Sequence, residues 1–167
     1  MTIETDRLII DHLDLSDAPF ILRLVNTPGW IEHIGDRNIH ELQAAERYIQ
    51  EGPLSSYARH GFGLWAMRLK SENKRSIGIC GLLQREYLDY PDLGFAILPE
   101  YEGRGLTLEA SRSVLDFANN QLKRSSIMAI TSPENKPSIA LLQKLGFTFK
   151  DVRREEDDLN IFQIELK

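Results

Sequence analysis

The sequence has few of the features that would place it in a membrane or an oxidising compartment. It contains a single cysteine, Cys80, so no internal disulfide can form. No stretch free of Asp, Glu, Lys and Arg is longer than the nine residues of 76–84 and 125–133. A transmembrane helix needs roughly 18 apolar residues. The N-terminal segment also carries acids where a signal peptide carries positive charge. We therefore expect a cytoplasmic protein that does not enter a membrane.

An excess of positive charge is also missing. The chain has 25 acidic and 20 basic side chains, a formal net charge of −5, and its basic residues are scattered. Domains that bind nucleic acid usually carry a basic patch, so we expect no nucleic-acid partner. The hydrophobic share of 42% and the charged share of 27% are typical of a globular protein, and 167 residues fit one domain, residues 1–167.

Hydrophobic periodicity and turn residues predict a mixed α/β protein. A strand over 7–13 precedes a helix over 16–26 that Pro28-Gly29 ends, and a second helix over 41–51 is closed by Gly52-Pro53. Strands over 62–69 and 76–84 are interpreted as an antiparallel pair. The later elements are a strand over 93–98, a helix from 106, a strand over 127–131, a helix over 136–145 with Gly146 after it, and strands over 147–152 and 159–166. The predicted order is β-α-α-β-β-β-α-β-α-β-β.

A glycine-containing turn at 102–107, Glu-Gly-Arg-Gly-Leu-Thr, joins a predicted strand to a predicted helix. Helix N-termini present unpaired N–H groups, and glycines let a phosphate approach that backbone closely. The turn is therefore a candidate diphosphate site, although two glycines alone also fit a turn that binds nothing. A Rossmann fingerprint needs a third glycine, and a Walker loop needs Gly-Lys-Ser/Thr; the chain has neither.

Four segments, in the right order and covering most of the chain, resemble one family. Residues 93–110, LGFAILPEYEGRGLTLEA, resemble the coenzyme A pyrophosphate signature of the GNAT superfamily of acyl-CoA N-acyltransferases. Residues 132–147, SPENKPSIALLQKLGF, resemble its second signature. Residues 5–10, TDRLII, and 30–35, WIEHIG, are similar to the RimJ/RimL-type branch. These matches favour the diphosphate site over a turn that binds nothing.

The resemblance implies a fold and an activity. The fold is a central, mixed, mostly antiparallel twisted sheet flanked by helices. The activity is direct transfer of the acetyl group from acetyl-CoA to a primary amine within a ternary complex, with no metal. The acceptor is a protein N-terminal amine, as in ribosomal-protein acetylation, or a small-molecule amine. We expect a monomer or homodimer. A non-catalytic module that binds or senses acyl-CoA remains an alternative.

The resemblance also implies which residues hold the cofactor. The strands ending at Leu98 and Thr131 should splay apart and let pantetheine run between them, bonded to free backbone groups around Ile97 and Leu98. The diphosphate would lie on the turn and the first helical residues. The implied cofactor-binding residues are Ile97, Leu98, Gly103, Arg104, Gly105, Leu106, Thr107, Asn135 and Ser138.

The turn departs from the family pattern at two positions. Glu102 replaces the usual Gln or Arg and should weaken diphosphate binding unless it points to solvent. Thr107 replaces Gly or Ala and adds a hydroxyl. Arg104, whose guanidinium suits phosphate, partly offsets the charge of Glu102.

Three residues are the candidates for catalysis. Asp92, at the start of the strand, is the first choice for the base that deprotonates the amine, directly or through water, although a solvated turn acid is equally compatible with the sequence. Ser138 is placed to donate a proton to the leaving sulfur, and Asn135 to approach the cofactor. Both also suit simple helix capping. Weaker base candidates are Glu32, Asp36 and Glu86.

The remaining reactive side chains fit structural roles better. Cys80 lies in the middle of a predicted strand and is interpreted as a buried small residue rather than a nucleophile. The four histidines have no metal-ligand spacing, so we expect no metal. Four aromatic residues are candidates for the acceptor pocket, although aromatic residues in strands more often pack in cores: Trp30, Trp65, Tyr87 and Tyr90.

Overall fold

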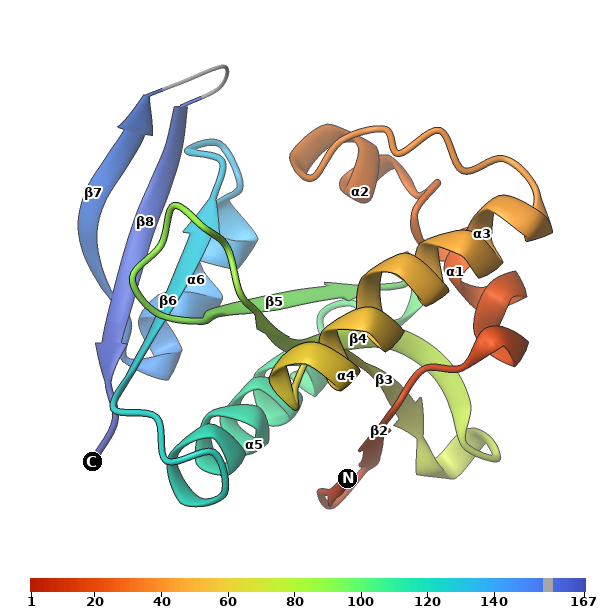
Figure 1. The fold of residues 1–167 in the computed structure, drawn as a ribbon, viewed down its shortest axis with the longest axis horizontal. Helices are drawn as coiled ribbons and strands as arrows, with labels where there is room; N and C mark the ends of the chain where they lie inside the picture. Colours follow the sequence, from red (N-terminus) through yellow and green to blue (C-terminus); the bar gives the residue numbers. More distant parts are fainter. Residues whose placement is uncertain (155–157) are drawn as a thin grey trace.

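The computed structural model describes residues 1–154 and 158–167 and contains one eight-stranded sheet in the order β1-β2-β3-β4-β5-β6-β8-β7 (Figure 1). Neighbouring strands run antiparallel except β5 and β6, which are parallel. The mixed, mostly antiparallel sheet predicted from the sequence is therefore confirmed. The strands are β1 (Thr2–Glu4), β2 (Leu8–Asp11), β3 (Leu64–Leu69), β4 (Arg75–Leu83), β5 (Asp92–Ile97), β6 (Ser126–Thr131), β7 (Thr148–Arg154) and β8 (Asp158–Glu165).

Helices lie on both faces of the sheet. The α-helices are α1 (Ala18–Leu24), α2 (Pro28–His33), α3 (Leu42–Ile49), α4 (Ser55–His60), α5 (Leu106–Asn120) and α6 (Lys136–Leu145). Helix α5 packs on one face of β4 and β5, whereas α3 and α4 cross the opposite face (Figure 1). Short 3₁₀ turns cover Leu15–Asp17, Lys70–Glu72 and Pro99–Tyr101. No helix within the described residues is long and apolar enough to span a bilayer.

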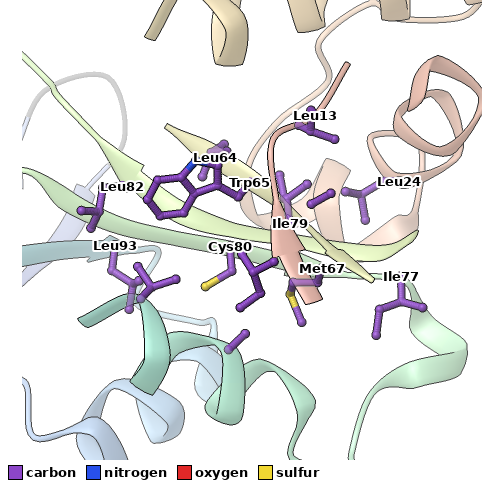
Figure 2. Packing of buried hydrophobic residues seen from close by; sticks show 14 of the residues in the cluster. Leu13, Leu24, Leu64, Trp65, Met67, Ile77, Ile79, Cys80, Leu82 and Leu93 are labelled. Carbon is purple, nitrogen blue, oxygen red and sulfur yellow. The ribbon is translucent and has the colours of Figure 1, made fainter. Parts of the chain in front are cut away.

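The core between the sheet and α5 shows which side chains of β3 and β4 point toward that helix. Trp65 of β3 packs edge-on against Phe117 of α5, with ring centroids 5.5 Å apart. Its cross-strand partner Cys80 points toward α5 (Figure 2). The Cys80 Sγ atom lies 3.7 Å from the hydroxyl of Ser111 on that helix. Burial raises the pKa of the Cys80 thiol to about 12. Both residues therefore belong to the core, as expected for Cys80, and Trp65 does not line an acceptor pocket.

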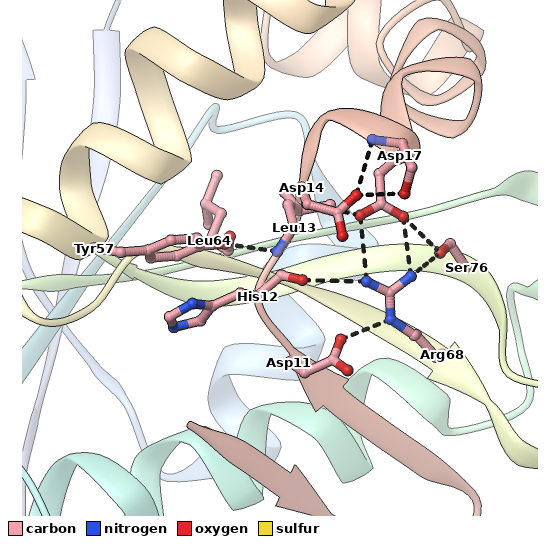
Figure 3. Close-up of polar contacts among 10 residues, drawn as sticks. Asp11, His12, Leu13, Asp14, Asp17, Tyr57, Leu64, Arg68 and Ser76 are labelled. Atoms are coloured by element: carbon pink, nitrogen blue, oxygen red, sulfur yellow. Dashed lines mark hydrogen bonds and ion pairs between the residues drawn. The ribbon is translucent and has the colours of Figure 1, made fainter.

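A polar network attaches the N-terminal strand to the sheet. Arg68 of β3 donates to Asp11 of β2 at 2.6 Å, to Asp17 at 2.9 Å and to Ser76 of β4 at 2.7 Å (Figure 3). Burial disfavours the charged guanidinium, but the two carboxylates outweigh it and raise the pKa of Arg68. Because each carboxylate comes from a different segment, this one cation joins β2, β3 and the turn before α1.

In the first third of the chain, two elements were missed and one prediction is wrong. Strand β1 was not expected, because three residues of an edge strand show no clear periodicity. The first helix does end before Pro28-Gly29, at Leu24, but Pro28 also starts α2, which was not expected; proline is favoured in the first helical turn. Gly52-Pro53 does not close the second helix, because residues Gln50–Leu54 form a π-helical turn that leads into α4. The wider hydrogen-bond spacing of a π-turn accommodates a proline that lacks an N–H.

Candidate active site

Strands β5 and β6 pair at one point only and then diverge. The single pair in their register is Asp92 with Met128, and the Met128 N–H donates to the Pro91 carbonyl at 2.9 Å. Beyond this point β5 continues toward α1 while β6 runs beside β8, so the two strands separate (Figure 1). The splay expected between the strands ending at 98 and 131 is therefore present.

The backbone of β5 offers hydrogen-bonding groups to this opening at alternate residues. The Leu98 N–H donates to Ile77 of β4 at 2.8 Å, and the Leu98 carbonyl accepts from Tyr101 at 3.0 Å. The prediction that Leu98 presents free groups is thus wrong, because both are engaged by neighbours on its own side. Successive residues of a strand point their groups to opposite edges. Those of Ile97 and Phe95 therefore face the open edge toward β6.

The glycine turn leads directly into the N-terminus of α5. Gly103 and Gly105 have φ of 76° and 75°, the left-handed region that glycine adopts without a steric penalty. Gly105 is the N-cap of this 15-residue helix, and no side-chain hydrogen bond caps it. A Cβ on Gly103 would meet no atom within 4 Å. The first amide groups of α5, at the positive end of its dipole, are accordingly accessible across a bare backbone.

The charged residues of the turn point outward. Glu102 is exposed, so its charge faces solvent. The Arg104 guanidinium lies 5.3 Å from the centre of the Tyr101 ring and donates to the Glu100 carbonyl at 3.2 Å. It remains exposed beside the turn. Thr107 is half-buried in the first turn of α5, whereas Leu106 is buried in the core and contributes only its backbone to the surface.

Asp92 is a buried, paired carboxylate. Its side chain is 1% exposed, and both of its oxygens lie 3.2 Å from Nε of Arg85. Burial raises the pKa of Asp92 to about 6, and Arg85 opposes that rise only in part. A solvated turn acid is therefore excluded. A carboxyl group with this pKa is ionised at neutral pH and remains basic enough to accept a proton.

The side chain of Asp92 faces the helices α3 and α4. Asp92 pairs with Leu83, whose side chain lines a pocket together with Leu64 and residues of α4. Phe95, three residues further along β5, pairs with Cys80 and so faces α5. Because side chains alternate along a strand, Asp92 lies on the face opposite to α5. The candidate base and the glycine turn are thus reached from opposite faces of the sheet.

Asn135 caps the N-terminus of α6, as its residue type favours. Asn135 is the N-cap, and its side-chain oxygen accepts from the Ser138 N–H at 3.3 Å. Within residues 1–154 and 158–167, no hydrogen bond is made by the Ser138 hydroxyl, which is half-buried. The capping interpretation therefore holds for Asn135, and it leaves the hydroxyl of Ser138 available.

Two features near the end of β6 were not predicted. His33 Nδ1 of α2 lies 3.2 Å from the Ser132 hydroxyl, just beyond β6, and this contact joins α2 to the far side of the opening. Thr131, the last residue of β6, is buried, and its hydroxyl has no partner among the described residues. Only the three-dimensional arrangement reveals these features, because each pairs segments about a hundred residues apart or depends on burial.

The other acidic candidates have ordinary surface positions. Glu32 is 72% exposed and lies 3.7 Å from Nε2 of His33. Asp36 accepts from the backbone of Asn38 at 2.8 Å in a turn, and Glu86 is exposed. Among the described residues, no group of three or more His, Cys, Asp or Glu side chains is arranged to hold a metal ion.

The aromatic candidates divide between core and surface. Trp30 is buried in α2, and its indole N–H has no partner in the part of the chain that the structure describes. Tyr87 and Tyr90, on the loop before β5, are 41% and 37% exposed. Arg153 of β7 lies over the Tyr87 ring at 3.5 Å, so this loop contacts the C-terminal hairpin beside the cleft.

Comparison with known proteins gives a consistent result. A family model described as "Acetyltransferase (GNAT) domain" matches residues 7–148. The uncharacterized N-acetyltransferase YoaA of Bacillus subtilis (strain 168) is 27% identical over 156 residues, which cover 92% of this chain and 86% of that protein. The RimL ribosomal alpha-N-protein acetyltransferase, solved in complex with coenzyme A, has a TM-score of 0.85 at 13% identity, covering 99% and 98% of the two chains. The microcin C7 self immunity acetyltransferase MccE, solved with acetyl-CoA and AMP, has a TM-score of 0.83 at 14% identity, covering 97% and 94%. These structural likenesses concern the fold.

Proposed function

The chain belongs to the GNAT acetyltransferase family and is an acyl-CoA-dependent N-acetyltransferase, and we propose that it transfers the acetyl group of acetyl-CoA directly to a primary amine in a ternary complex. One observation carries this proposal more than any other. Strand β5 opens from β6 immediately after Asp92 and leads, through the 3₁₀ turn Pro99–Tyr101, to a glycine turn that exposes the N-terminus of α5. A thioester bound along this opening lies between a buried base and a diphosphate site.

The residues present suit coenzyme A along its whole length. The amide groups at the start of α5 and the exposed guanidinium of Arg104 would hold the diphosphate. The free backbone groups of Ile97 and Phe95 would bond pantetheine as an added strand bonds a sheet edge. The Ser138 hydroxyl, across the cleft on α6, would donate to the sulfur. When bound, acetyl-CoA supplies the activated acetyl group and a thiolate leaving group.

In this scheme Asp92 accepts one proton from the ammonium group, through water because its side chain is 1% exposed. The free amine nitrogen then attacks the thioester carbonyl carbon and gives up its second proton to water as the amide forms. The carbon–sulfur bond breaks, and the leaving thiolate takes up a proton through the Ser138 hydroxyl, which regains one from water. No protein nucleophile is needed. Cys80 is unsuited to that role because it is buried in the core against α5.

The ordinary pKa values of amines favour one class of acceptor. A base with a pKa of about 6 must take a proton from an ammonium group before attack. A protein α-ammonium has a pKa of about 8, whereas that of a lysine-like ammonium is about 10.4. Proton transfer to Asp92 is therefore far less unfavourable from an α-ammonium than from a lysine-like one. We therefore propose a protein or peptide N-terminal α-amine as the acceptor, in line with a RimJ/RimL-type branch. A small-molecule amine is the second candidate.

Binding and turnover measurements test the proposal together. Isothermal titration with acetyl-CoA is expected to show binding, and a thiol-release assay across peptides, polyamines and amino-acid derivatives is expected to show turnover that is fastest with an α-amine. Binding without turnover on every acceptor would favour a sensing module instead. Absence of binding would contradict both functions. The cytoplasmic location and the monomeric or dimeric state stay predictions.

A further inference from the structure

The N-terminal segment 5–10, which resembles one branch of the family, has no role in the scheme above. In the structure its turn, Thr5 to Arg7, joins β1 to β2 and contacts the first turn of α5, about a hundred residues later in the chain. Three hydrogen bonds converge on the carboxylate of Glu109. They come from the Thr5 hydroxyl at 2.6 Å, the Arg7 N–H at 3.0 Å and Arg7 Nε at 2.8 Å.

The same arginine reaches the glycine turn itself. Arg7 Nη1 donates to the carbonyl oxygen of Arg104 at 2.9 Å, between the two left-handed glycines. Its Nη2 lies 3.6 Å from the position that a Cβ on Gly105 would occupy. One guanidinium therefore holds both sides of the turn, through Arg104 before the helix and through Glu109 inside its first turn.

Because this proposal rests on the proposed function, it concerns the same diphosphate. We propose that Arg7 is a positioning residue of the acyl-CoA site, which fixes the glycine turn in its diphosphate-binding conformation and neutralises Glu109 beside the bound anion. The turn has a separate need for such a support. Its two glycines, at φ of 76° and 75°, have much conformational freedom, and no side chain caps α5.

Neutralisation is needed because Glu109 is ionised at a place where an anion binds. Partial burial opposes ionisation, but the hydrogen bonds from Thr5 and Arg7 outweigh it and hold the pKa of Glu109 below its ordinary value. Without Arg7, a full negative charge would face the diphosphate from the first turn of α5. A negative charge in that turn favours the helix alone but repels a bound anion.

The experiment compares Arg7→Ala with two other variants by titration with coenzyme A. Arg7→Ala is expected to raise the dissociation constant about tenfold, since one charge-assisted support and one counter-charge are lost. Arg7→Lys keeps the charge but cannot contact both Arg104 and Glu109, so a smaller rise of about threefold is expected. Arg23→Ala is the matched control. It removes a similarly exposed arginine that pairs with Glu100, just before the turn, and is expected to change the constant less than twofold.

An acetyl donor that lacks the diphosphate distinguishes a role of Arg7 in positioning the diphosphate site from a role in the stability of the protein. With S-acetyl-pantetheine in place of acetyl-CoA, Arg7→Ala is expected to leave kcat/KM unchanged, whereas with acetyl-CoA it raises KM and leaves kcat nearly constant. Equal losses with both donors, or an unchanged dissociation constant in Arg7→Ala and Arg7→Lys, would overturn the assignment. If the unaltered protein binds no coenzyme A, the proposed function itself fails, and the titration of that protein shows this independently.

Discussion

Asp92 and Arg85 form an ion pair at the point where the sheet divides: both carboxylate oxygens lie 3.2 Å from the same Nε atom, and the carboxylate is almost fully buried. Arg85 follows β4, and Asp92 begins β5, so the pair spans the loop that joins these two strands. The guanidinium keeps the carboxylate ionised at neutral pH, while burial keeps it basic. A general base needs both properties.

Replacement of Asp92, the proposed base, should affect acceptors unequally. Asp92→Asn is expected to lower kcat/KM by roughly 10²- to 10⁴-fold for a lysine-like acceptor, and by less for a peptide α-amine, whose ammonium loses its proton more readily. Thiol-release kinetics with one acceptor of each type measure the difference. Glu86→Gln, an exposed acid on the same loop, serves as the control. Small and equal losses for both acceptors would remove Asp92 as the base.

The pH profile should report the same group. Burial raises the pKa of Asp92 to about 6, and the proposed base can accept a proton only when ionised, so kcat/KM is expected to rise with pH through about 6. Below that value protonation inactivates the base. Stopped assays between pH 5 and 8, at saturating acetyl-CoA, measure this rise in kcat/KM. The rise near pH 6 should be absent from Asp92→Asn. If it persists in that variant, it belongs to another titrating group.

A bulky residue in the glycine turn should block the donor. Gly105→Trp is expected to abolish acetyl-CoA binding while the fold survives, because the indole occupies the approach to the first amides of α5. The left-handed φ of 75° adds a strain of about 1 kcal/mol. Gly61→Trp is the matched control, with φ of 77° and open space at the end of α4. Unchanged affinity in Gly105→Trp would show that the turn does not bind the diphosphate.

Substitutions of Asn135 and Ser138 at the start of α6 should affect different quantities, stability for Asn135 and kcat for Ser138. Asn135→Ala removes the cap and is expected to lower the free energy of unfolding by about 1 kcal/mol. Ser138→Ala leaves that hydrogen bond intact, since the backbone N–H makes it, and should instead lower kcat about tenfold by removing the proposed proton donor to sulfur. Urea unfolding and steady-state kinetics on both variants measure this. A loss of stability without a loss of kcat in Ser138→Ala would assign the hydroxyl a structural role.

The buried hydroxyl of Thr131 should cost stability in the free protein. A buried polar group without a partner carries a penalty of about 1–3 kcal/mol, so the isosteric Thr131→Val is expected to raise the urea midpoint. Thr131→Ser, which keeps the hydroxyl and loses a methyl group, should lower it. If Val is destabilising, the hydroxyl has a partner in solution.

Local signals predicted the elements with strong caps and periodicity. Helix α6 begins and ends where the sequence indicated, because Asn135 caps it and Gly146 adopts the left-handed conformation after it. Helix α2 was missed, since proline and glycine at its start also suit a turn. The continuation into α4 was missed because a π-turn has no simple sequence pattern.

The candidate site was predictable only where a residue acts through its own local backbone. The glycine turn and Asn135 were placed by their neighbours in sequence. The burial of Asp92, its pairing with Arg85, and the engagement of Leu98 by Ile77 depend on strand register. The contact of Arg7 with Glu109 depends on segments about a hundred residues apart, so only the folded chain shows it.

The single point of pairing between β5 and β6 makes the sheet two antiparallel sheets joined at one edge, β1 to β5 and β6 to β8. The strands within each part are paired by continuous backbone hydrogen bonds, whereas β5 and β6 share almost none between the two parts. A ligand that bonds to both edges completes the ladder and acts as a missing ninth strand. Its binding energy then adds to the stability of the folded protein, because the ligand bridges the two parts of the sheet.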